Sequence, residues 1–230
     1  MMLDHLQNTS GIPRGPITVA ARRGPTMFAK RIIDLVGASA LLVLTAPLLL
    51  IVAVSIRLTS PGPVVFCQER VGLCGRTFVL FKFRSMFDGV TDATHRAQNL
   101  AELAGEGEID GRVSYKDADD PRITPVGRIL RRFSIDELPQ LINVLKGDMS
   151  LVGPRPSLVW EVAEFPLHID RRFSVRPGLT GLWQVSGRNN WSLREMLEID
   201  CDYADSLTVL GDIGILLRTV PAAVRGDGAA

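Results

Sequence analysis

The longest apolar segment of the chain covers residues 35–56 and contains no charged side chain. As a straight helix it would measure about 33 Å, enough to cross a hydrocarbon layer of about 30 Å. Pro47 lies at its middle, where it would kink the helix. Basic residues flank the segment on both sides, which favours keeping both ends on the cytoplasmic side of a membrane. We therefore predict a re-entrant helix hairpin bent at Pro47, with a kinked membrane span as the alternative.

Two short apolar runs follow, at 64–68 and 77–84, and they surround a glycine-containing turn. This pattern predicts a β-hairpin. In the second run Lys82 and Arg84 alternate with phenylalanines, so both basic side chains lie on one face of the strand. Two cations on a strand face are usually only solvated. Placed soon after a membrane anchor, they could instead bind a diphosphate.

Helical patterns dominate the rest of the chain. The predicted helices begin at Thr124, cover 158–165, cover 192–203 with a Ser192 cap and a Glu195 capping box, and cover 207–224. The last of these helices is strongly apolar, which suits either a membrane interface or a buried core. Residues 182–185 are predicted to form a short strand, and 87–120 an insertion with one short helix.

Together these elements predict the α+β fold class. An N-terminal re-entrant membrane helix hairpin precedes a compact, mostly helical cytoplasmic domain with a small β-hairpin or sheet and interfacial amphipathic helices. The predicted boundaries are a disordered tail at 1–26, the anchor at 27–59, the folded domain at 60–224 and a short tail at 225–230.

An adjacent acid pair, Asp136 and Glu137, lies between fixed positive charges. Arg131 is one helical turn upstream, and Arg155 follows downstream between two prolines, whose rings restrict the local backbone to extended conformations. Apolar positions after the pair recur at helical spacing as far as Gly147. The acids therefore lie at or just before the start of a short helix, where anions are favoured.

A structural role for the pair is the main alternative, because Ser134 and Glu137 have the spacing of a capping box. Pro139 argues against it. With Ser134 as the cap, the proline falls at the fifth helical position, where it costs roughly 3 kcal/mol. A helix that starts nearer Asp136 places Pro139 in the tolerated first turn. These residues alone leave structure and chemistry both open.

Composition narrows the function classes. A net charge of +1 provides no overall field for nucleic acid, so a nucleic-acid binder is disfavoured. The three cysteines show no metal-ligand spacing, which indicates a reduced, cytosol-facing domain without disulfides.

Three motifs closely resemble the bacterial sugar transferase family, in that family's order and spacing: FKFRSM, DPRITPVGRILRRFSIDELPQLINVLKGDMSLVGPRP and VRPGLTGLWQVSGRNNW. Members are monotopic polyprenyl-phosphate phosphoglycosyl transferases of the undecaprenyl-phosphate galactose or glucose phosphotransferase type. The resemblance implies transfer of a sugar 1-phosphate from a UDP-sugar to undecaprenyl phosphate, with release of UMP and with Mg2+. It implies the bacterial inner membrane, a catalytic domain facing the cytoplasm and the first membrane step of exopolysaccharide assembly. It leaves a homodimer open.

In this family the adjacent Asp-Glu pair is catalytic, and the Asp forms a covalent phosphosugar intermediate. The resemblance assigns these roles, and Mg2+ binding, to Asp136 and Glu137. The candidate phosphate-binding residues are basic and lie in the three motifs: Lys82, Arg84, Arg131, Arg155, Arg176 and Arg188. The family's helix commonly breaks at a proline preceded by serine, whereas Ala46 precedes Pro47 here. A rival from another class, a non-catalytic membrane-tethered protein that binds nucleotide sugars or phospholipid head groups, would keep the basic residues without needing the acids.

Overall fold

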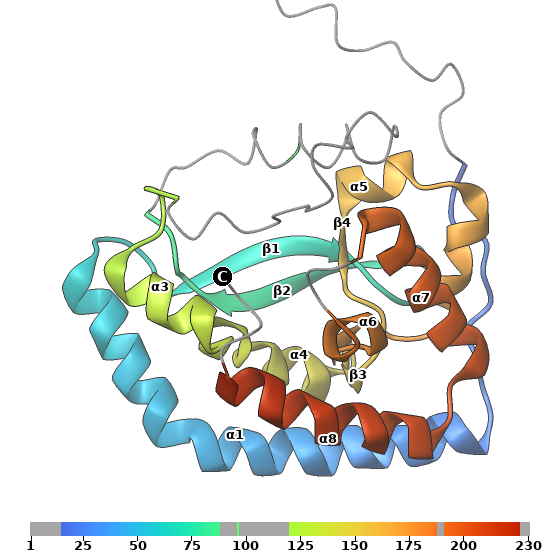
Figure 1. Ribbon diagram of the computed structural model, residues 1–230, viewed down its shortest axis with the longest axis horizontal. Coiled ribbons are helices and arrows are strands. Elements are labelled where there is room, and N and C mark those ends of the chain that lie inside the picture. The colour runs from blue at the N-terminus through green and yellow to red at the C-terminus, as the bar shows by residue number, and fades with distance from the viewer. Residues whose placement is uncertain (1–14, 88–95, 97–119, 188–190, 226–230) are drawn as a thin grey trace, which may run out of the picture.

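The N-terminal helix α1 organises the computed structural model, which describes residues 15–87, 96, 120–187 and 191–225. It runs unbroken over Pro25–Thr59 with Pro47 inside it. Figure 1 shows that α1 changes direction partway along but does not double back. The bend is therefore as predicted, whereas a hairpin of two antiparallel limbs is not seen. A single proline removes one backbone hydrogen bond, and the helix continues on both sides of it.

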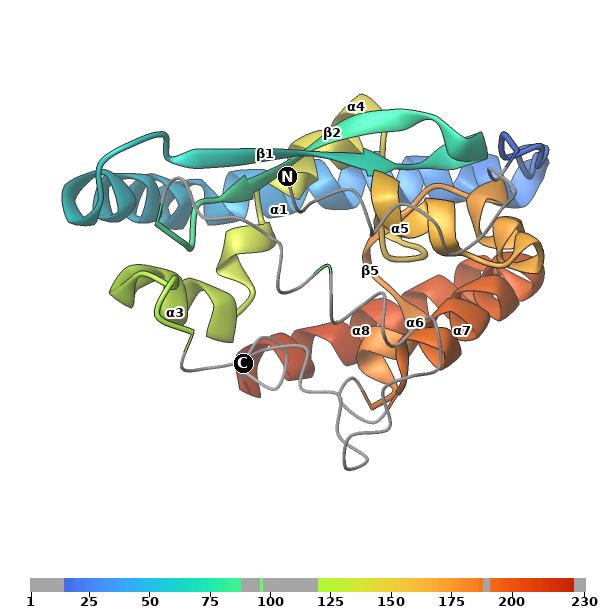
Figure 2. The same cartoon turned by 90° about the horizontal axis from the view of Figure 1, so that it is seen from above.

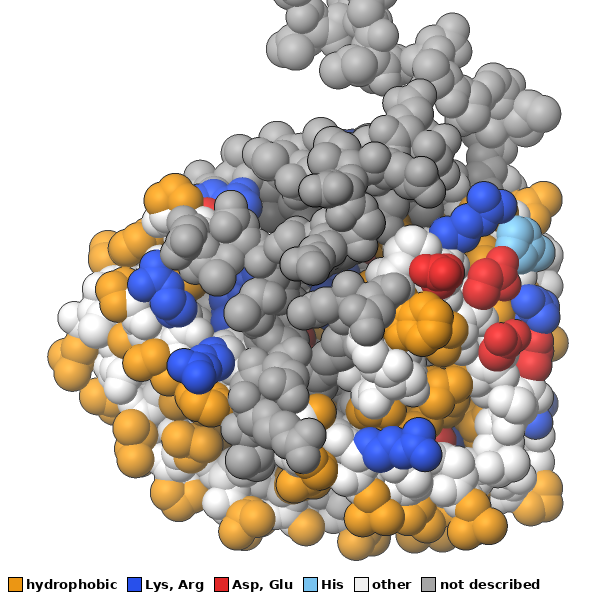
Figure 3. Space-filling view, in the orientation of Figure 1, with side chains coloured by type: hydrophobic (Ala, Val, Ile, Leu, Met, Phe, Trp, Pro, Cys, Tyr) orange, Lys and Arg blue, Asp and Glu red, His pale blue; other side chains and the backbone are white. Residues whose placement is uncertain are grey.

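The middle and end of α1 present apolar side chains to the surroundings. By length and composition α1 could cross a membrane, and only 11% of its most apolar window is buried. Its most exposed large apolar residues are Phe28, Val36, Val43, Leu44, Leu50, Ile51 and Leu58. Figure 3 shows hydrophobic side chains gathered along the lower and left margins of the molecule, where α1 lies. Such a continuous apolar surface is typical of a membrane or protein contact.

The first turns of α1 are instead tied to the folded domain by buried polar groups. The Lys30 ammonium forms an ion pair with Asp212 at 2.5 Å, and both side chains are about 95% buried. The Asp34 carboxylate accepts hydrogen bonds from the Ser150 hydroxyl at 2.8 Å and the Leu151 amide at 2.9 Å. The side of these turns that carries Lys30 and Asp34 is therefore fixed to the domain, whereas Phe28 on the same turns is exposed.

The predicted β-hairpin is confirmed. Strands β1 (Val65–Val71) and β2 (Thr77–Phe83) pair antiparallel, and β4 (Ser157–Leu158) adds to the other edge of β1, so the strand order is β2-β1-β4. A second, parallel pair joins β3 (Ser150–Val152) to β5 (Gly178–Thr180). We did not predict this pair, because strands of three residues carry too little alternation to be recognised.

Helices and short 3-10 turns connect and cover these strands (Figures 1 and 2). In chain order they are η1 (Leu73–Gly75), α3 (Pro125–Arg132), η2 (Ile135–Glu137), α4 (Gln140–Lys146), α5 (Val159–Glu164), η3 (Leu167–Ser174), α6 (Leu182–Val185), α7 (Leu193–Ser206) and α8 (Val209–Arg225). The starts of α3 and α7 are as predicted. Thr124 caps α3 by accepting from the Gly127 amide, and Ser192 and Glu195 form a capping box on α7.

The segment 182–185 is a helical turn, so its prediction as a strand was wrong. Leu182 and Val185 both pack against the main core, and Trp183 is 8% exposed. Spacing of three residues places two side chains on one side of a helix but on opposite faces of a strand. The packing of this segment therefore requires the helical turn.

The main core lies between α1, α4, β3 and α8. Its most buried members are Ala38, Leu80, Leu141, Val144, Met149, Val152, Val175 and Ala204. Figure 2 shows α1, α4 and the hairpin along one side of the molecule, with α7 and α8 along the other. Helix α8 combines buried Asp212 and Ile215 with exposed Leu210 and Leu217, so it is partly core and partly surface.

Residues 15–24 differ from the predicted disordered tail. The Arg22 amide donates to the Ser174 carbonyl at 2.7 Å, and its guanidinium donates to the Ala204 carbonyl at 2.5 Å. Ile17 packs against an apolar cluster to which β1, α5, η3 and α7 contribute. The predicted insertion at 87–120 lies almost entirely outside the described residues.

Candidate active site

The acid pair precedes helix α4, as the sequence predicted. Asp136 and Glu137 form the end of the 3-10 turn η2, and α4 then runs to a left-handed Gly147 with φ 90°. Ser134 has φ 54° and makes no side-chain capping bond. The capping-box alternative is therefore wrong. Pro139 immediately precedes α4, where its missing amide hydrogen breaks no helical bond.

A lysine from the hairpin meets the second acid of the pair. Lys82 on β2 donates to the Glu137 carboxylate at 2.9 Å, and the two side chains are 21% and 23% exposed. This partial burial reduces screening of the ion pair by solvent. Residues 55 positions apart in the chain are thus brought to one place.

Asn143 joins helix α4 to strand β2 beside this ion pair. It is fully buried on α4, and its side chain accepts from the Phe81 amide at 3.1 Å and donates to the Val79 carbonyl at 2.7 Å. Strand β2 is an edge of its sheet, so these two backbone groups have no strand partner on that side. The amide of Asn143 replaces that partner and fixes α4 against β2. The distance between Lys82 and Glu137 follows from this attachment.

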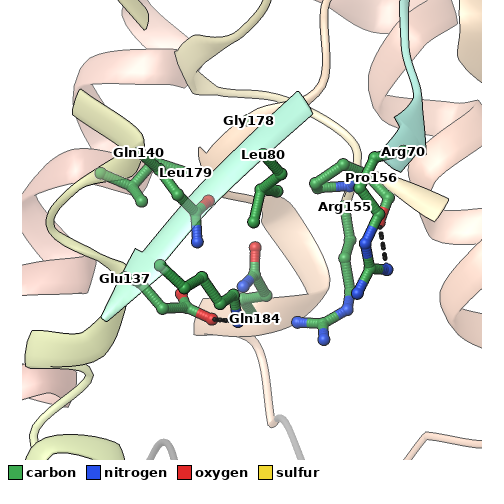
Figure 4. Close-up of a pocket in the computed structure, with 10 residues that line it drawn as sticks. Arg70, Leu80, Glu137, Gln140, Arg155, Pro156, Gly178, Leu179 and Gln184 are labelled. Atoms are coloured by element: carbon green, nitrogen blue, oxygen red, sulfur yellow. Dashed lines mark hydrogen bonds and ion pairs between the residues drawn. The ribbon is translucent and has the colours of Figure 1, made fainter. Parts of the chain in front are cut away.

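A cleft of about 280 Å³, which includes space open to solvent, lies over the pair. Its lining residues are Arg70, Leu80, Lys82, Glu137, Gln140, Arg155, Pro156, Gly178, Leu179 and Gln184. Figure 4 shows Glu137 and Arg155 pointing into the cleft from opposite sides. Three cations therefore converge on one acid, an arrangement suited to a ligand with several negative charges.

Arg155 is the predicted arginine that the structure places in the cleft. Its side chain is exposed, and within the described part of the chain its guanidinium makes no hydrogen bond or ion pair. Arg70 on β1 is a cleft residue that the sequence analysis missed. Its guanidinium donates to the Pro156 carbonyl at 3.1 Å and to Gln68 at 2.7 Å. Gln140 and Gln184 were missed as well.

Asp136 is 7% exposed and lies beside Glu137 rather than in the cleft lining itself. Among the described residues no group of three or more His, Cys, Asp or Glu side chains could hold a metal ion. Mg2+ commonly uses only one or two carboxylates together with substrate phosphates. The adjacent carboxylates of Asp136 and Glu137 fit that mode of binding.

The remaining predicted basic residues lie elsewhere. Arg84 is 5% exposed, and its guanidinium donates to the carbonyl and hydroxyl of Ser60 at 2.8 and 2.7 Å, so it braces the end of α1. Arg176 donates to the Gly147 carbonyl at 2.8 Å and thereby satisfies the end of α4. Neither residue lines the cleft. Arg188 lies outside the described residues.

Arg131 on α3 does not line the cleft either. It lies near Asp120, whose pKa is below its ordinary value. The main cause is the hydrogen bond that Arg122 donates to Asp120, and the charge of Arg131 contributes less. Because Arg131 lies outside the cleft lining, the structure does not support its predicted contact with phosphate.

An acid pair, a cationic cleft and an exposed apolar helix suit a protein that handles a phosphate-bearing ligand at a membrane surface. The model of the bacterial sugar transferase family matches residues 25–226 of the chain. The chain belongs to this family.

Individual relatives agree with the family match. The chain is 41% identical to the galactosyl transferase CpsE of Streptococcus agalactiae over 88% of its own length and 44% of that protein. It is 40% identical to the UDP-glucose:undecaprenyl-phosphate glucose-1-phosphate transferase of Caulobacter vibrioides over 94% of its own length and 76% of that protein. It is 36% identical to the exopolysaccharide production protein ExoY of Rhizobium meliloti, covering 87% and 88%. The chain thus spans less than half of CpsE but most of ExoY.

Proposed function

We propose that this protein transfers a sugar 1-phosphate from a UDP-sugar, with galactose or glucose as the sugar, to undecaprenyl phosphate and releases UMP. The observation that carries the proposal is the cleft in which Lys82, Arg70 and Arg155 surround Glu137, next to Asp136 in the chain. The relative from Caulobacter vibrioides, named for this reaction with glucose, and CpsE, named as a galactosyl transferase, support it. The product would serve the first membrane step of exopolysaccharide assembly.

The first half-reaction places the donor diphosphate in the cleft. A carboxylate oxygen of Asp136 attacks the phosphorus that bears the sugar, the bond from that phosphorus to UMP breaks, and UMP leaves. Attack by one anion on another requires positive charge to offset their repulsion. Arg155 and Arg70 supply it from one wall of the cleft and Lys82 from the other. A sugar phosphate then remains on Asp136.

The second half-reaction returns the carboxylate. An oxygen of undecaprenyl phosphate attacks the same phosphorus, the bond to Asp136 breaks, and the sugar diphosphate of undecaprenol leaves. Glu137 positions Lys82 throughout by their ion pair. Mg2+, held by Asp136 and Glu137, would neutralise charge on the transferring phosphates.

The acceptor confines the reaction to the membrane surface. Undecaprenyl phosphate carries a long apolar chain, so its phosphate stays at the level of the lipid head groups. The exposed apolar part of α1 would hold the cleft at that level, and the buried contacts of Lys30 and Asp34 with the domain would fix its orientation. We propose that both ends of α1 stay on the cytoplasmic side of the bacterial inner membrane, with the domain in the cytoplasm.

A donor panel tests the proposal. Purified full-length protein is incubated with undecaprenyl phosphate, Mg2+ and one nucleotide sugar at a time, and nucleoside monophosphate release is measured. With UDP-galactose or UDP-glucose we expect continued UMP release, one UMP for each acceptor consumed, when undecaprenyl phosphate is present, and at most one UMP per protein molecule when it is withheld. The exposed variant Asp202→Asn serves as a control and should match the wild type. Binding of the nucleotide sugar without any UMP release would instead identify a non-catalytic binding protein.

A further inference from the structure

A buried ion pair between Arg172 and Asp200 binds the backbone of Arg155. The Arg155 amide donates to the Asp200 carboxylate at 3.2 Å, and the Arg155 carbonyl accepts from the Arg172 guanidinium at 2.7 Å. Arg172 and Asp200 form their own ion pair at 2.5 Å, and each side chain is 2% exposed. Arg172 also donates to the hydroxyl of Ser157. Both polar groups of the Arg155 backbone are therefore held by the same pair.

The pair is itself held rigidly. The Arg172 guanidinium lies over the rings of Phe165 and Phe173, at 5.7 and 5.5 Å from their centroids. Asp200 comes from α7 and Arg172 from η3, so two separate elements meet behind the cleft wall. Prolines on both sides of Arg155 remove further backbone freedom. The backbone of Arg155 is therefore fixed, and its side chain points into the cleft (Figure 4).

Stability alone is a poor explanation for this pair. Burying two charges has a large desolvation cost, and an apolar pair of the same size is often at least as stable. The cost is visible in Asp200, because burial raises its pKa to about 6 despite the nearby Arg172. One of its oxygens, Oδ1, has no hydrogen-bond partner in the described part of the structure. What an apolar pair could not do is bind the amide and the carbonyl of Arg155.

We propose that Arg172 and Asp200 are positioning residues that act through Arg155 on the donor diphosphate. This inference rests on the proposed function, because it assigns the diphosphate to the cleft. Without the two hydrogen bonds to its backbone, Arg155 would be less well oriented in the free protein. More conformational freedom would then be lost when the diphosphate binds.

A double-mutant cycle tests the coupling. UDP binding to the full-length protein is measured by calorimetry for the wild type, Arg155→Ala, Arg172→Lys and the double variant. Arg155→Ala should weaken UDP binding about tenfold or more, since it removes charge-assisted hydrogen bonds. Arg172→Lys should weaken binding about threefold to tenfold when Arg155 is present, and less than about twofold in the Arg155→Ala background. Asp200→Asn, which is nearly isosteric, repeats the cycle if Arg172→Lys fails to fold.

The buried pair of Lys30 and Asp212 offers a matched control, because it joins α1 to α8 and neither residue lines the cleft. Asp212→Asn should change UDP binding by the same factor with and without Arg155. Equal effects of Arg172→Lys in both backgrounds would overturn the inference. Failure of the proposed function gives a different result: the cycle remains non-additive, but no UMP is released from UDP-sugars.

Discussion

Asn143 provides a quantitative test of how the site is assembled. Replacing it by leucine keeps the branched shape and the number of side-chain heavy atoms but removes the hydrogen bonds to Phe81 and Val79. Each such bond contributes roughly 0.5–1.5 kcal/mol net, so we expect a loss of about 1–3 kcal/mol in the free energy of unfolding. For a chain of this size, that corresponds to a fall of about 2–12 °C in the unfolding midpoint. Turnover should fall as well, because α4 would no longer hold Glu137 at a fixed distance from Lys82.

Thermal unfolding of the purified protein in one detergent measures the effect. Lys146→Ala is the control on the same helix: its side chain is 51% exposed, and its ion pair with Asp148 should contribute less than about 1 kcal/mol. If Asn143→Leu unfolds at the wild-type temperature and keeps wild-type turnover, the edge of β2 does not depend on α4, and this reasoning is refuted.

Three further predictions concern the anchor, the buried pair and the cleft arginine. Pro47→Leu should straighten α1, move some molecules toward a spanning topology and lower activity; cysteine labelling of residues 27 and 60 from each side of the membrane would detect the change, and an unchanged pattern would count against a role for the bend. Because the pKa of Asp200 is raised to about 6 in the folded state, folding takes up a proton, and stability should fall as pH rises from about 4 to 6. Asp200→Asn should flatten that part of the curve in urea unfolding, and an equally steep decline in the variant would contradict the assignment. Arg155→Lys keeps the charge but loses the planar fork, so turnover should drop about tenfold or more; near-normal kinetics would reduce Arg155 to a structural residue.

The position of the acid pair could be predicted because local rules decide it. Pro139 excludes a helix that starts at Ser134, and Gly147 ends the helix that follows. The hairpin was predictable for the same reason, since alternation and a glycine turn are local signals. Arg155 could be predicted as a site residue because two prolines flank it and because it lies in a family motif.

Contacts between distant segments could not be predicted in this way. Asn143 reads as a polar residue within an apolar helix, and nothing near it in the sequence points to strand β2, some 62 positions away. Alternation placed Lys82 and Arg84 on one face. The strand ends at Phe83, however, and Arg84 turns to Ser60 at the end of α1. Arg172 and Asp200 lie in segments with no chemical motif, and only the fold brings them behind Arg155.

The covalent step is the central claim, and one measurement tests it most directly. Full-length protein is mixed with donor labelled in the sugar while undecaprenyl phosphate is withheld, and the protein is digested and mapped by mass spectrometry. We predict a phosphosugar adduct on Asp136 that disappears when acceptor is added, and no adduct in Asp136→Asn, which should fold because its replacement is nearly isosteric. An adduct on another residue, or full transfer by Asp136→Asn, would contradict the claim and indicate direct attack by the lipid phosphate.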